Sequence, residues 1–415
     1  MRIDILVPQD AGNRFIMNRP YRLAYLVSHP IQYQAPLLRY ISAHPKIDLT
    51  VFFLSDHSTR RHVDPGFGVF VQWDVSLLDG YKHVFLPSVG QKDRLSFWSP
   101  ISYGLCRVFK TGDFDYLWVH GYAHHAIVRA IILAKCLGVK VLLRGESNLI
   151  SRQRTHIKKW IKDLTFPLLL RAINGFLAIG TLNRAFYSHH GVPDEKIFSL
   201  PYAVENNFFR DGVCEARPNR ELFRAKLNLK PNFPIILYTS KILRHKRPGD
   251  LLEAYIRLSP DGVQQPSSYL IYVGDGEERA NLEARVNELG WSSVRFLGFM
   301  NQKELAKYYD LCDIFVLPSE HEPWGLVINE VMNAEKAVIL SDRIGSGLDL
   351  VENGRNGFIV PVGDIEMLSH RLRTLTGNPD LTRQMGIYSY QKISGWDFES
   401  GLKGLLQALI TLDSK

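Results

Sequence analysis

The chain has 415 residues, which is more than one hydrophobic core usually organises, so two domains are expected. Its formal net charge of +8 suits anionic ligands or an anionic membrane face, and no stacking motif of an RNA-binding module appears, so we expect no nucleic-acid partner. The scattered cysteines contain no C-x-x-C pair, which excludes a zinc-ribbon or disulfide framework and suits a reducing cytosol: Cys106, Cys136, Cys214 and Cys312.

Residues 1–20 precede the first predicted strand and form an N-terminal extension to which we assign no role. Their apolar run is too short for a signal peptide, and an acid interrupts it. No stretch of the chain reaches the roughly 18 to 20 apolar residues that a membrane span requires. We therefore expect a cytoplasmic protein.

Apolar runs of strand length alternate with helical stretches through most of the chain. Many runs are continuous and rich in β-branched residues, as strands buried on both faces of a parallel sheet are. Such alternation predicts an α/β protein with doubly wound, Rossmann-like sheets. The predicted strands are 22–28, 49–55, 116–121, 139–146 and 175–180 in the first half, and 234–240, 268–276, 293–298, 312–319, 337–342 and 357–362 in the second.

A polar, Pro-interrupted stretch without a strand, residues 206–233, separates the two series. We place an N-terminal Rossmann-like domain at residues 21–210 and a C-terminal one at residues 211–385, facing each other across a cleft. Residues 386–415 are then a final helical segment.

Two features of the first domain leave alternatives open. Asp113-Phe114-Asp115 is formally a D-x-D metal-binding signature, and we interpret it as a solvated turn before the next strand. A basic amphipathic stretch at residues 152–170 either packs on the first sheet or lies on anionic lipid at the inner face of a membrane. Its basic residues are Arg152, Arg154, Lys158, Lys159 and Lys162.

The strand ends of the second domain carry chemistry that suits a phosphate. Lys241 and Lys246 follow the first of its strands and can pair with a pyrophosphate, although alone they equally describe a solvated basic loop. Gly274 and Gly276 form a turn after the next strand, a weak signal in isolation. Three such strand ends in one domain are a stronger indication than any one of them.

The third strand end is the segment "EHEPWGLVINE", residues 320–330, which runs from a buried strand into a predicted helix. Ligands of open α/β sheets bind where strand ends lead into helices. The first residues of this helix present unpaired N–H groups that suit a phosphate: Trp324, Gly325, Leu326 and Val327. Glu322 and Glu330 can accept hydrogen bonds from sugar hydroxyls, although two glutamates eight apart also arise by chance.

Taken in order, these segments resemble the GT-B glycosyltransferases of glycosyltransferase family 4. The resemblance covers most of residues 235–365, through "SKILRHK", "VGDGEE", "EHEPWGLVINE" and "VENGRNGFIVPVGD", and is looser in the first half. It implies a GT-B fold whose last helix crosses back onto the first domain. It also implies a retaining enzyme that moves a sugar from a nucleotide-diphosphate donor to an acceptor hydroxyl.

The resemblance assigns roles to individual positions. Glu322 matches the acid near the reacting centre, Glu330 the acid that holds the ribose, and the amides of residues 325–327 those that meet the sugar and phosphates. Lys241 and Lys246 match a basic pair on the pyrophosphate, the first of which is usually Arg. His120, in "WVHG", matches a histidine of the donor-sugar pocket.

The family's glycine-rich loop is replaced here by "SHPIQYQAP", so the resemblance does not transfer an acceptor. In this candidate acceptor and phosphate loop the side chains are those of His29, Gln32 and Tyr33. We expect a UDP- or GDP-sugar donor, a glycan, lipid-linked or small-molecule acceptor, and no metal or other cofactor. The alternatives are a metal-dependent D-x-D enzyme with a single mixed sheet, and a catalytically degenerate partner protein.

Overall fold

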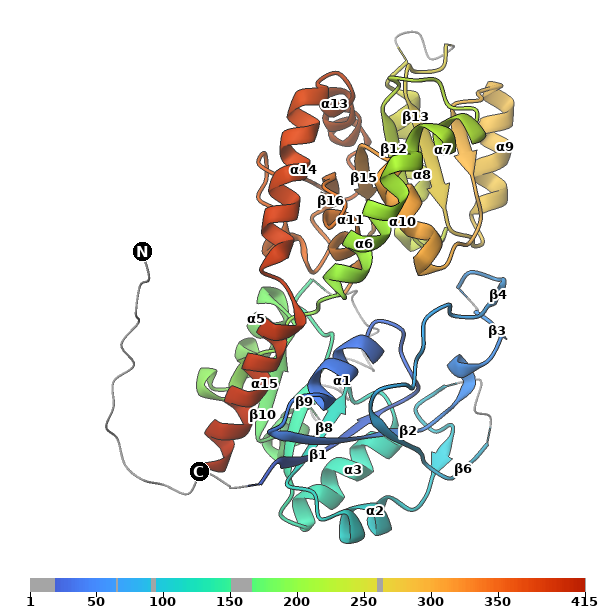
Figure 1. The fold of residues 1–415 in the computed structure, drawn as a ribbon. Helices are drawn as coiled ribbons and strands as arrows, with labels where there is room; N and C mark the ends of the chain where they lie inside the picture. Colours follow the sequence, from blue (N-terminus) through green and yellow to red (C-terminus); the bar gives the residue numbers. More distant parts are fainter. Residues whose placement is uncertain (1–18, 65, 91–94, 151–165, 260–263, 415) are drawn as a thin grey trace.

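A computed structural model describes residues 19–64, 66–90, 95–150, 166–259 and 264–414. It contains two domains, each built on a parallel sheet with helices on both faces (Figure 1). The predicted α/β fold class is therefore confirmed. Residues 1–18 of the extension and 152–165 of the basic stretch lie outside the described residues. Within the described part, no helix combines the length and the apolar character needed to span a bilayer.

The N-terminal sheet has seven strands in the order β11-β10-β9-β8-β1-β2-β5. Every pairing in it is parallel. The strands are β1 (Tyr21–Val27), β2 (Ile47–Phe53), β5 (Lys82–Phe85), β8 (Tyr116–His120), β9 (Lys140–Arg144), β10 (Gly175–Ala178) and β11 (Ile197–Ser199). The sequence analysis missed β5, whose residues are mostly exposed, and β11, which has three residues.

Several helices cover the described part of this sheet, and two short hairpins extend from it. The helices are α1 (Ala35–Ser42), α2 (Leu105–Gly112), α3 (His125–Cys136) and α5 (Thr181–His189). The hairpins pair β3 (His62–Val63) with β4 (Phe70–Val71), and β6 (Ser88–Val89) with β7 (Ile101–Ser102). Figure 1 shows that the β3–β4 hairpin rises from the N-terminal domain toward the other one.

The C-terminal sheet has six parallel strands in the order β14-β13-β12-β15-β16-β17. They are β12 (Ile235–Thr239), β13 (Tyr269–Val273), β14 (Val294–Phe296), β15 (Ile314–Leu317), β16 (Ala337–Ser341) and β17 (Gly357–Val360). The helices around them are α8 (Pro248–Ile256), α9 (Arg279–Leu289), α10 (Gln302–Leu311), α11 (Leu326–Met332), α12 (Gly347–Leu350), α13 (Ile365–Thr376) and α14 (Pro379–Ser394).

Both sheets place their first strand beside their fourth. This is the doubly wound order, in which the chain reverses direction across the sheet at one point. That point lies between β1 and β8 in the N-terminal sheet and between β12 and β15 in the C-terminal sheet. Ligands of open α/β sheets bind outside the carboxyl ends of the strands at such a point.

The predicted junction forms helices and no strand. It contains α6 (Asn206–Ala216) and α7 (Arg220–Lys226), which pack on α10 of the C-terminal domain. The last helix, α15 (Phe398–Asp413), packs instead on β10 and β11 of the N-terminal domain. Tyr116 of β8 donates to the carbonyl of Leu409 in this helix at 2.9 Å. The chain thus passes between the domains twice.

The two crossings are bound to each other. Asn206 donates to the carbonyls of Ile393 and Trp396, at 3.3 and 3.2 Å. The indole of Trp396 in turn donates to the carbonyl of Tyr202 at 2.5 Å, and Asn329 of α11 donates to the same carbonyl at 3.2 Å. We call this group of contacts, among Tyr202, Asn206, Asn329, Ile393 and Trp396, the hinge. It holds α11 against the N-terminal domain.

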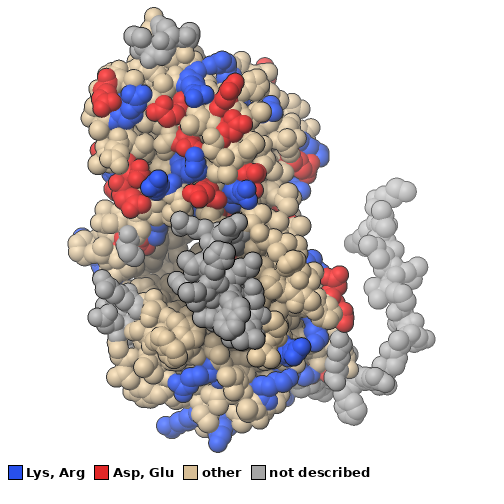
Figure 2. Space-filling view, turned by 180° about the vertical axis from the view of Figure 1, so that it is seen from behind, with Lys and Arg blue, Asp and Glu red and all other residues tan. Residues whose placement is uncertain are grey.

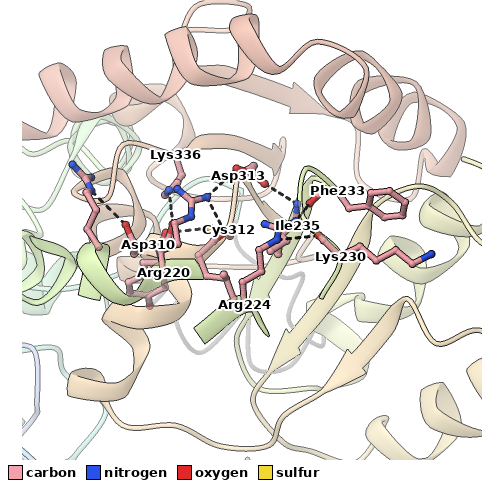
Figure 3. Close-up of polar contacts among 12 residues, drawn as sticks. Arg220, Arg224, Lys230, Phe233, Ile235, Asp310, Cys312, Asp313 and Lys336 are labelled. Carbon is pink, nitrogen blue, oxygen red and sulfur yellow. Dashed lines mark hydrogen bonds and ion pairs between the residues drawn. The ribbon is translucent and has the colours of Figure 1, made fainter. Parts of the chain in front are cut away.

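A polar cluster fixes the opposite, amino edge of the C-terminal sheet (Figure 3). Arg220 contacts Asp313 at 3.2 Å, and the buried Lys336 donates to the carbonyl of Asp310 at 2.8 Å. Burial lowers the pKa of Lys336. The guanidinium of Arg224 donates to the carbonyls of a neighbouring turn. A hollow of about 690 Å³ lies beside this cluster, but the cations named here are engaged by the fold itself.

Candidate functional site

The carboxyl ends of the two sheets meet at a cavity of about 300 Å³, called here the interdomain cavity. The N-terminal domain contributes Gln32, Phe67 and Trp73 to it. The C-terminal domain lines the rest with Thr239, Ser240, Lys241, Lys246, Val273, Gly274, Phe299, Met300, Gln302, Leu305, Tyr309, Glu322, Gly325, Leu326, Val327 and Glu330. Most of the residues singled out in the sequence are therefore brought together here.

Both lysines reach this cavity, and both are paired with acids. Lys241 lies 2.7 Å from the carboxylate of Asp64 and 4.8 Å from the ring centre of Phe67, both on the β3–β4 hairpin of the other domain. Lys246 forms an ion pair with Glu322, and both side chains are largely buried. A bound phosphate would have to compete with these carboxylates for the ammonium groups.

Asp64 is held firmly in its pairing. Burial alone would raise the pKa of its carboxyl, but the hydrogen bonds from Lys241 and from the backbone N–H groups of Phe67 and Gly66 lower it. The amide distances to its Oδ1 are 3.0 and 2.8 Å. The carboxylate is therefore charged at neutral pH and closes the site from the N-terminal side.

The Gly-Asp-Gly turn has a backbone role that the sequence analysis did not identify. Gly274 has φ of +140°, and a Cβ there would lie 2.0 Å from the carbonyl oxygen of Ser240. The amide of Ile242 donates to the carbonyl of Asp275 at 2.8 Å. The turn thus packs directly against the loop that carries Lys241 and positions it.

The Pro-Trp-Gly corner turns the chain from β15 into α11. Gly325 has φ of +90°, a backbone conformation that favours glycine, and a Cβ there would lie 3.2 Å from Cγ of Glu322 and press on that side chain. Helix α11 begins at Leu326, and Leu326 and Val327 line the cavity. The first N–H groups of a helix have no partner within it and can bind an anion.

The side chain of Trp324 does not line the cavity. It is buried at the hinge, where its ring stacks on Trp396 with centroids 5.6 Å apart and its Nε1 donates to Asn329 at 2.9 Å. Its ring also meets Tyr202 edge to face at 6.1 Å. The indole therefore fixes the corner against the N-terminal domain.

Glu330 lines the cavity with an unusual carboxyl group. Burial raises its pKa to about 7, although hydrogen bonds from Tyr309 and Gln302 work against that rise. The bond from the Tyr309 hydroxyl is 2.5 Å long. Near neutral pH this side chain is therefore divided between its charged and neutral forms, and a hydroxyl donor would favour the charged form.

The three candidate residues of the loop after β1 lie in different surroundings. Gln32 lines the cavity, and its buried Nε2 has no hydrogen-bond partner among the described residues. Tyr33 instead donates to Glu146 at 3.1 Å. His29 stacks near His57 at 4.5 Å, and burial and the neighbouring histidines lower its pKa to about 3, so it is neutral at physiological pH.

His120, at the end of β8, belongs to a second polar group, which we call the N-domain cluster. This cluster comprises His120, Glu146, Tyr33, Tyr202 and Gln34. Gln34 Nε2 lies 3.1 Å from His120 Nε2, and the hydroxyl of Tyr202 lies 3.4 Å from the same nitrogen. Glu146 and Tyr202 were not identified from the sequence, although Glu146 is the last residue of the predicted strand 139–146 and that position was a usable signal.

The D-x-D segment lies at the other end of the N-terminal sheet. Asp113 pairs with Arg22, and Asp115 accepts hydrogen bonds from Arg19 at 3.1 and 2.7 Å. Both acids precede β8, whereas the cavity lies beyond its carboxyl end. Within the described ranges no cluster of His, Cys, Asp and Glu is suited to a metal ion. The metal-dependent D-x-D alternative predicts a single mixed sheet. That prediction is wrong, because each domain is built on a parallel sheet of its own.

Comparison with known proteins finds a matching family model and several sequence relatives. Residues 219–392 match the family described as "Glycosyl transferases group 1". The chain is 31% identical over 173 residues to the lipopolysaccharide core biosynthesis glycosyltransferase LpsE of Rhizobium meliloti, covering 41% of this chain and 48% of the relative. It is 29% identical over 195 residues to alpha-D-kanosaminyltransferase of Streptomyces kanamyceticus, covering 47% and 48%. The chain spans about half the length of these curated relatives.

Solved structures resemble the whole fold. Sucrose-phosphate synthase from Thermosynechococcus elongatus aligns with a TM-score of 0.69 at 18% identity, over 95% of this chain and 99% of that one. Anabaena HepE, solved in complex with UDP-glucose, aligns with a TM-score of 0.68 at 18% identity, over 95% and 100%. The fold is GT-B, as the sequence predicted, and these likenesses concern the fold alone.

Proposed function

Because residues 219–392 match the family described as "Glycosyl transferases group 1", we propose that the chain is a glycosyltransferase that uses a nucleotide-diphosphate sugar. The observation that carries this proposal is the interdomain cavity, where two lysines, the start of α11 and two glutamates converge at the strand-order reversal of the C-terminal sheet. Cations and free N–H groups suit a diphosphate, and carboxylates suit the hydroxyls on either side of it.

The donor diphosphate would bind between Lys246 and the N–H groups of Leu326 and Val327. Glu330 would accept hydrogen bonds from the ribose diol, and Glu322 from hydroxyls of the sugar. HepE has been solved with UDP and with UDP-glucose, which favours a uridine donor as the first to test, with a GDP-sugar as the alternative. A glycan, a lipid-linked glycan or a small molecule would be the acceptor.

The transfer would retain the configuration at the anomeric carbon. The bond from this carbon to the phosphate oxygen breaks, and its electron pair stays on the diphosphate. The acceptor oxygen attacks from the same face, and its proton passes to the departing phosphate oxygen. The lysine charges and the oriented N–H groups stabilise the diphosphate as its charge grows, so no metal ion is required for that task.

Titration calorimetry with UDP and GDP tests the donor site, and a panel of nucleotide sugars followed by NMR of the released sugar tests the reaction. We expect micromolar to millimolar affinity for one nucleotide, no effect of EDTA on hydrolysis, and first release of the α-anomer from an α-linked donor. Loss of activity in EDTA, restored by manganese, would overturn the metal-independent mechanism. If neither UDP nor GDP binds, the proposal that the protein is an enzyme is overturned.

A further inference from the structure

Among the described residues, the N-domain cluster contains a carboxylate with one oxygen engaged in hydrogen bonds and the other without a partner. Glu146 Oε1 accepts hydrogen bonds from Tyr202 and, at 3.1 Å, from Tyr33, and it lies 3.7 Å from Nε2 of His120. Among the described residues Oε2 has no partner, and 38% of the side chain is exposed. A carboxylate that is fixed through one oxygen presents the other in a set direction.

Other residues fix the donors that hold Glu146. The buried guanidinium of Arg144 lies 4.4 Å from the ring centre of Tyr202 and donates to the carbonyls of Leu200 and Pro201, at 3.1 and 3.2 Å. Gln34 is itself held by the hydroxyl of Tyr25, at 2.6 Å. The cluster is therefore a rigid support, built at the carboxyl ends of β1, β8 and β9.

This support lies against the Pro-Trp-Gly corner of the other domain. Asn148, two residues after Glu146, donates to the carbonyl of Pro323 at 3.3 Å. Tyr202 contacts Trp324 ring to ring and accepts from Asn329 through its carbonyl. Glu146 thus lies two residues from the contact with the segment that carries Glu322, and it does not itself line the interdomain cavity.

The carboxylate is charged throughout the physiological range. Burial would raise the pKa of Glu146, but hydrogen bonding and charge interaction with His120 and the hydroxyls of Tyr202 and Tyr33 lower it to about 2. A charged oxygen without a protein partner is a strong hydrogen-bond acceptor. In a cleft that holds sugars, the available donors are hydroxyl groups.

We propose that Glu146 is a specificity residue whose Oε2 accepts a hydrogen bond from a substrate hydroxyl, either on the transferred sugar or on the acceptor. Tyr33 and Tyr202 are then positioning residues that hold the carboxylate. The inference rests on the proposed function, because it needs a sugar in the interdomain cleft.

The variant Glu146→Gln tests the free oxygen selectively. Its amide oxygen can still accept from Tyr33 and Tyr202, while an NH₂ group, which is a donor, replaces Oε2. The matched control is Glu195→Gln, the same change at an exposed position of the same domain. Thermal unfolding of each variant verifies that the fold is retained.

Three measurements are compared: calorimetric affinity for UDP or GDP, affinity for and hydrolysis of the nucleotide sugar that the wild type uses, and transfer to a panel of nitrophenyl glycosides. If the hydroxyl belongs to the transferred sugar, Glu146→Gln weakens nucleotide-sugar binding about 10- to 100-fold and leaves nucleotide binding unchanged. If it belongs to the acceptor, hydrolysis is unchanged and transfer falls by a similar factor.

Tyr33→Phe removes one of the hydrogen bonds that hold Oε1 and should produce a smaller loss of the same kind, which a merely structural role of Glu146 would not predict. If Glu146→Gln binds the nucleotide and its nucleotide-sugar binding, hydrolysis and transfer are all unchanged, this inference is overturned and the proposed function is not. A wild-type protein that binds neither nucleotide would overturn the proposed function, and the inference with it.

Discussion

The two domains share one architecture but carry different chemistry at the same place in it. Each sheet reverses its strand order once, between β1 and β8 or between β12 and β15. At the C-terminal reversal the chain places lysines, a helix start and glutamates. At the N-terminal reversal it places the N-domain cluster of tyrosines, a glutamine, a histidine and Glu146. The loops, and not the sheets, therefore set what each domain can bind.

The two domains also differ in net charge, and the more basic one is not the one that carries the candidate phosphate site. Residues 21–210 hold 23 Lys and Arg against 13 Asp and Glu, whereas residues 211–385 hold 21 against 24. Figure 2 shows both signs interspersed over the C-terminal domain, while Lys and Arg predominate at the far end of the N-terminal domain. The domain with the candidate phosphate site is thus the less basic one, so placement of a few groups matters more there than total charge.

The largest effect is expected at the acid of the Pro-Trp-Gly corner. Glu322→Gln should lower turnover about 100- to 1000-fold, because it removes a charge beside the reacting centre and leaves Lys246 without its partner. The comparison is with Glu320→Gln, an exposed acid two residues away. Steady-state hydrolysis of the nucleotide sugar measures both. Full turnover in Glu322→Gln would show that the reacting centre lies elsewhere.

Substitution of Lys246 tests whether its charge binds the diphosphate. Lys246→Met keeps the apolar stem and should weaken nucleotide binding about 10- to 100-fold in calorimetry, since a charge-assisted contact is lost. Lys403→Met, which removes an exposed partner of Glu399 on α15, should leave affinity unchanged. Equal affinities of the two variants would contradict the assignment.

Glu330 gives the C-terminal site a pH dependence, because burial raises the pKa of its carboxyl. Its pKa of about 7 means that binding a ribose diol to the charged form must first remove a proton below that pH. Affinity for the nucleotide sugar should therefore rise up to about tenfold per pH unit below 7 and level off above it. Glu330→Gln should bind weakly with no such slope. A flat wild-type profile between pH 5.5 and 8 would contradict the ribose role.

The same group affects stability with a definite sign. Its folded pKa lies above the ordinary value of 4.5, so the folded state holds the proton more tightly and the free energy of unfolding falls as pH rises from about 4.5 to 7. Glu330→Gln should be more stable than the wild type at pH 8 by about 1 to 3 kcal/mol. Urea unfolding at pH 5 and pH 8 measures the difference, which should be much smaller at pH 5.

The smallest effect is expected where the domains meet across the cavity. Asp64 competes with phosphate for Lys241, so Asp64→Asn should tighten nucleotide binding about two- to fivefold, the range of a partly exposed ion pair. Asp79→Asn, at an exposed position of the same domain, serves as the control. Weaker binding in Asp64→Asn would mean that Asp64 supports the ligand instead of excluding it.

What could be predicted from the sequence follows the same division between the domains. The C-terminal site is encoded in short segments, so Lys246, Gly325 and Glu330 could be singled out when three strand ends were considered together, whereas the spacing of any one segment also arises by chance. The N-domain cluster joins residues that lie up to 169 positions apart in the chain, from Tyr33 to Tyr202, and only the folded sheet brings them together. The ion pair between Lys241 and Asp64 depends on how the domains pack, which no local pattern encodes.

The central claim is that a diphosphate binds at the strand-order reversal of the C-terminal sheet. A crystal soaked with UDP or GDP tests this claim most directly. We predict that the diphosphate lies within hydrogen-bond distance of Lys246 Nζ and of the N–H groups of Leu326 and Val327, with the ribose at Glu330. A nucleotide bound elsewhere, with this cavity empty, would contradict the account.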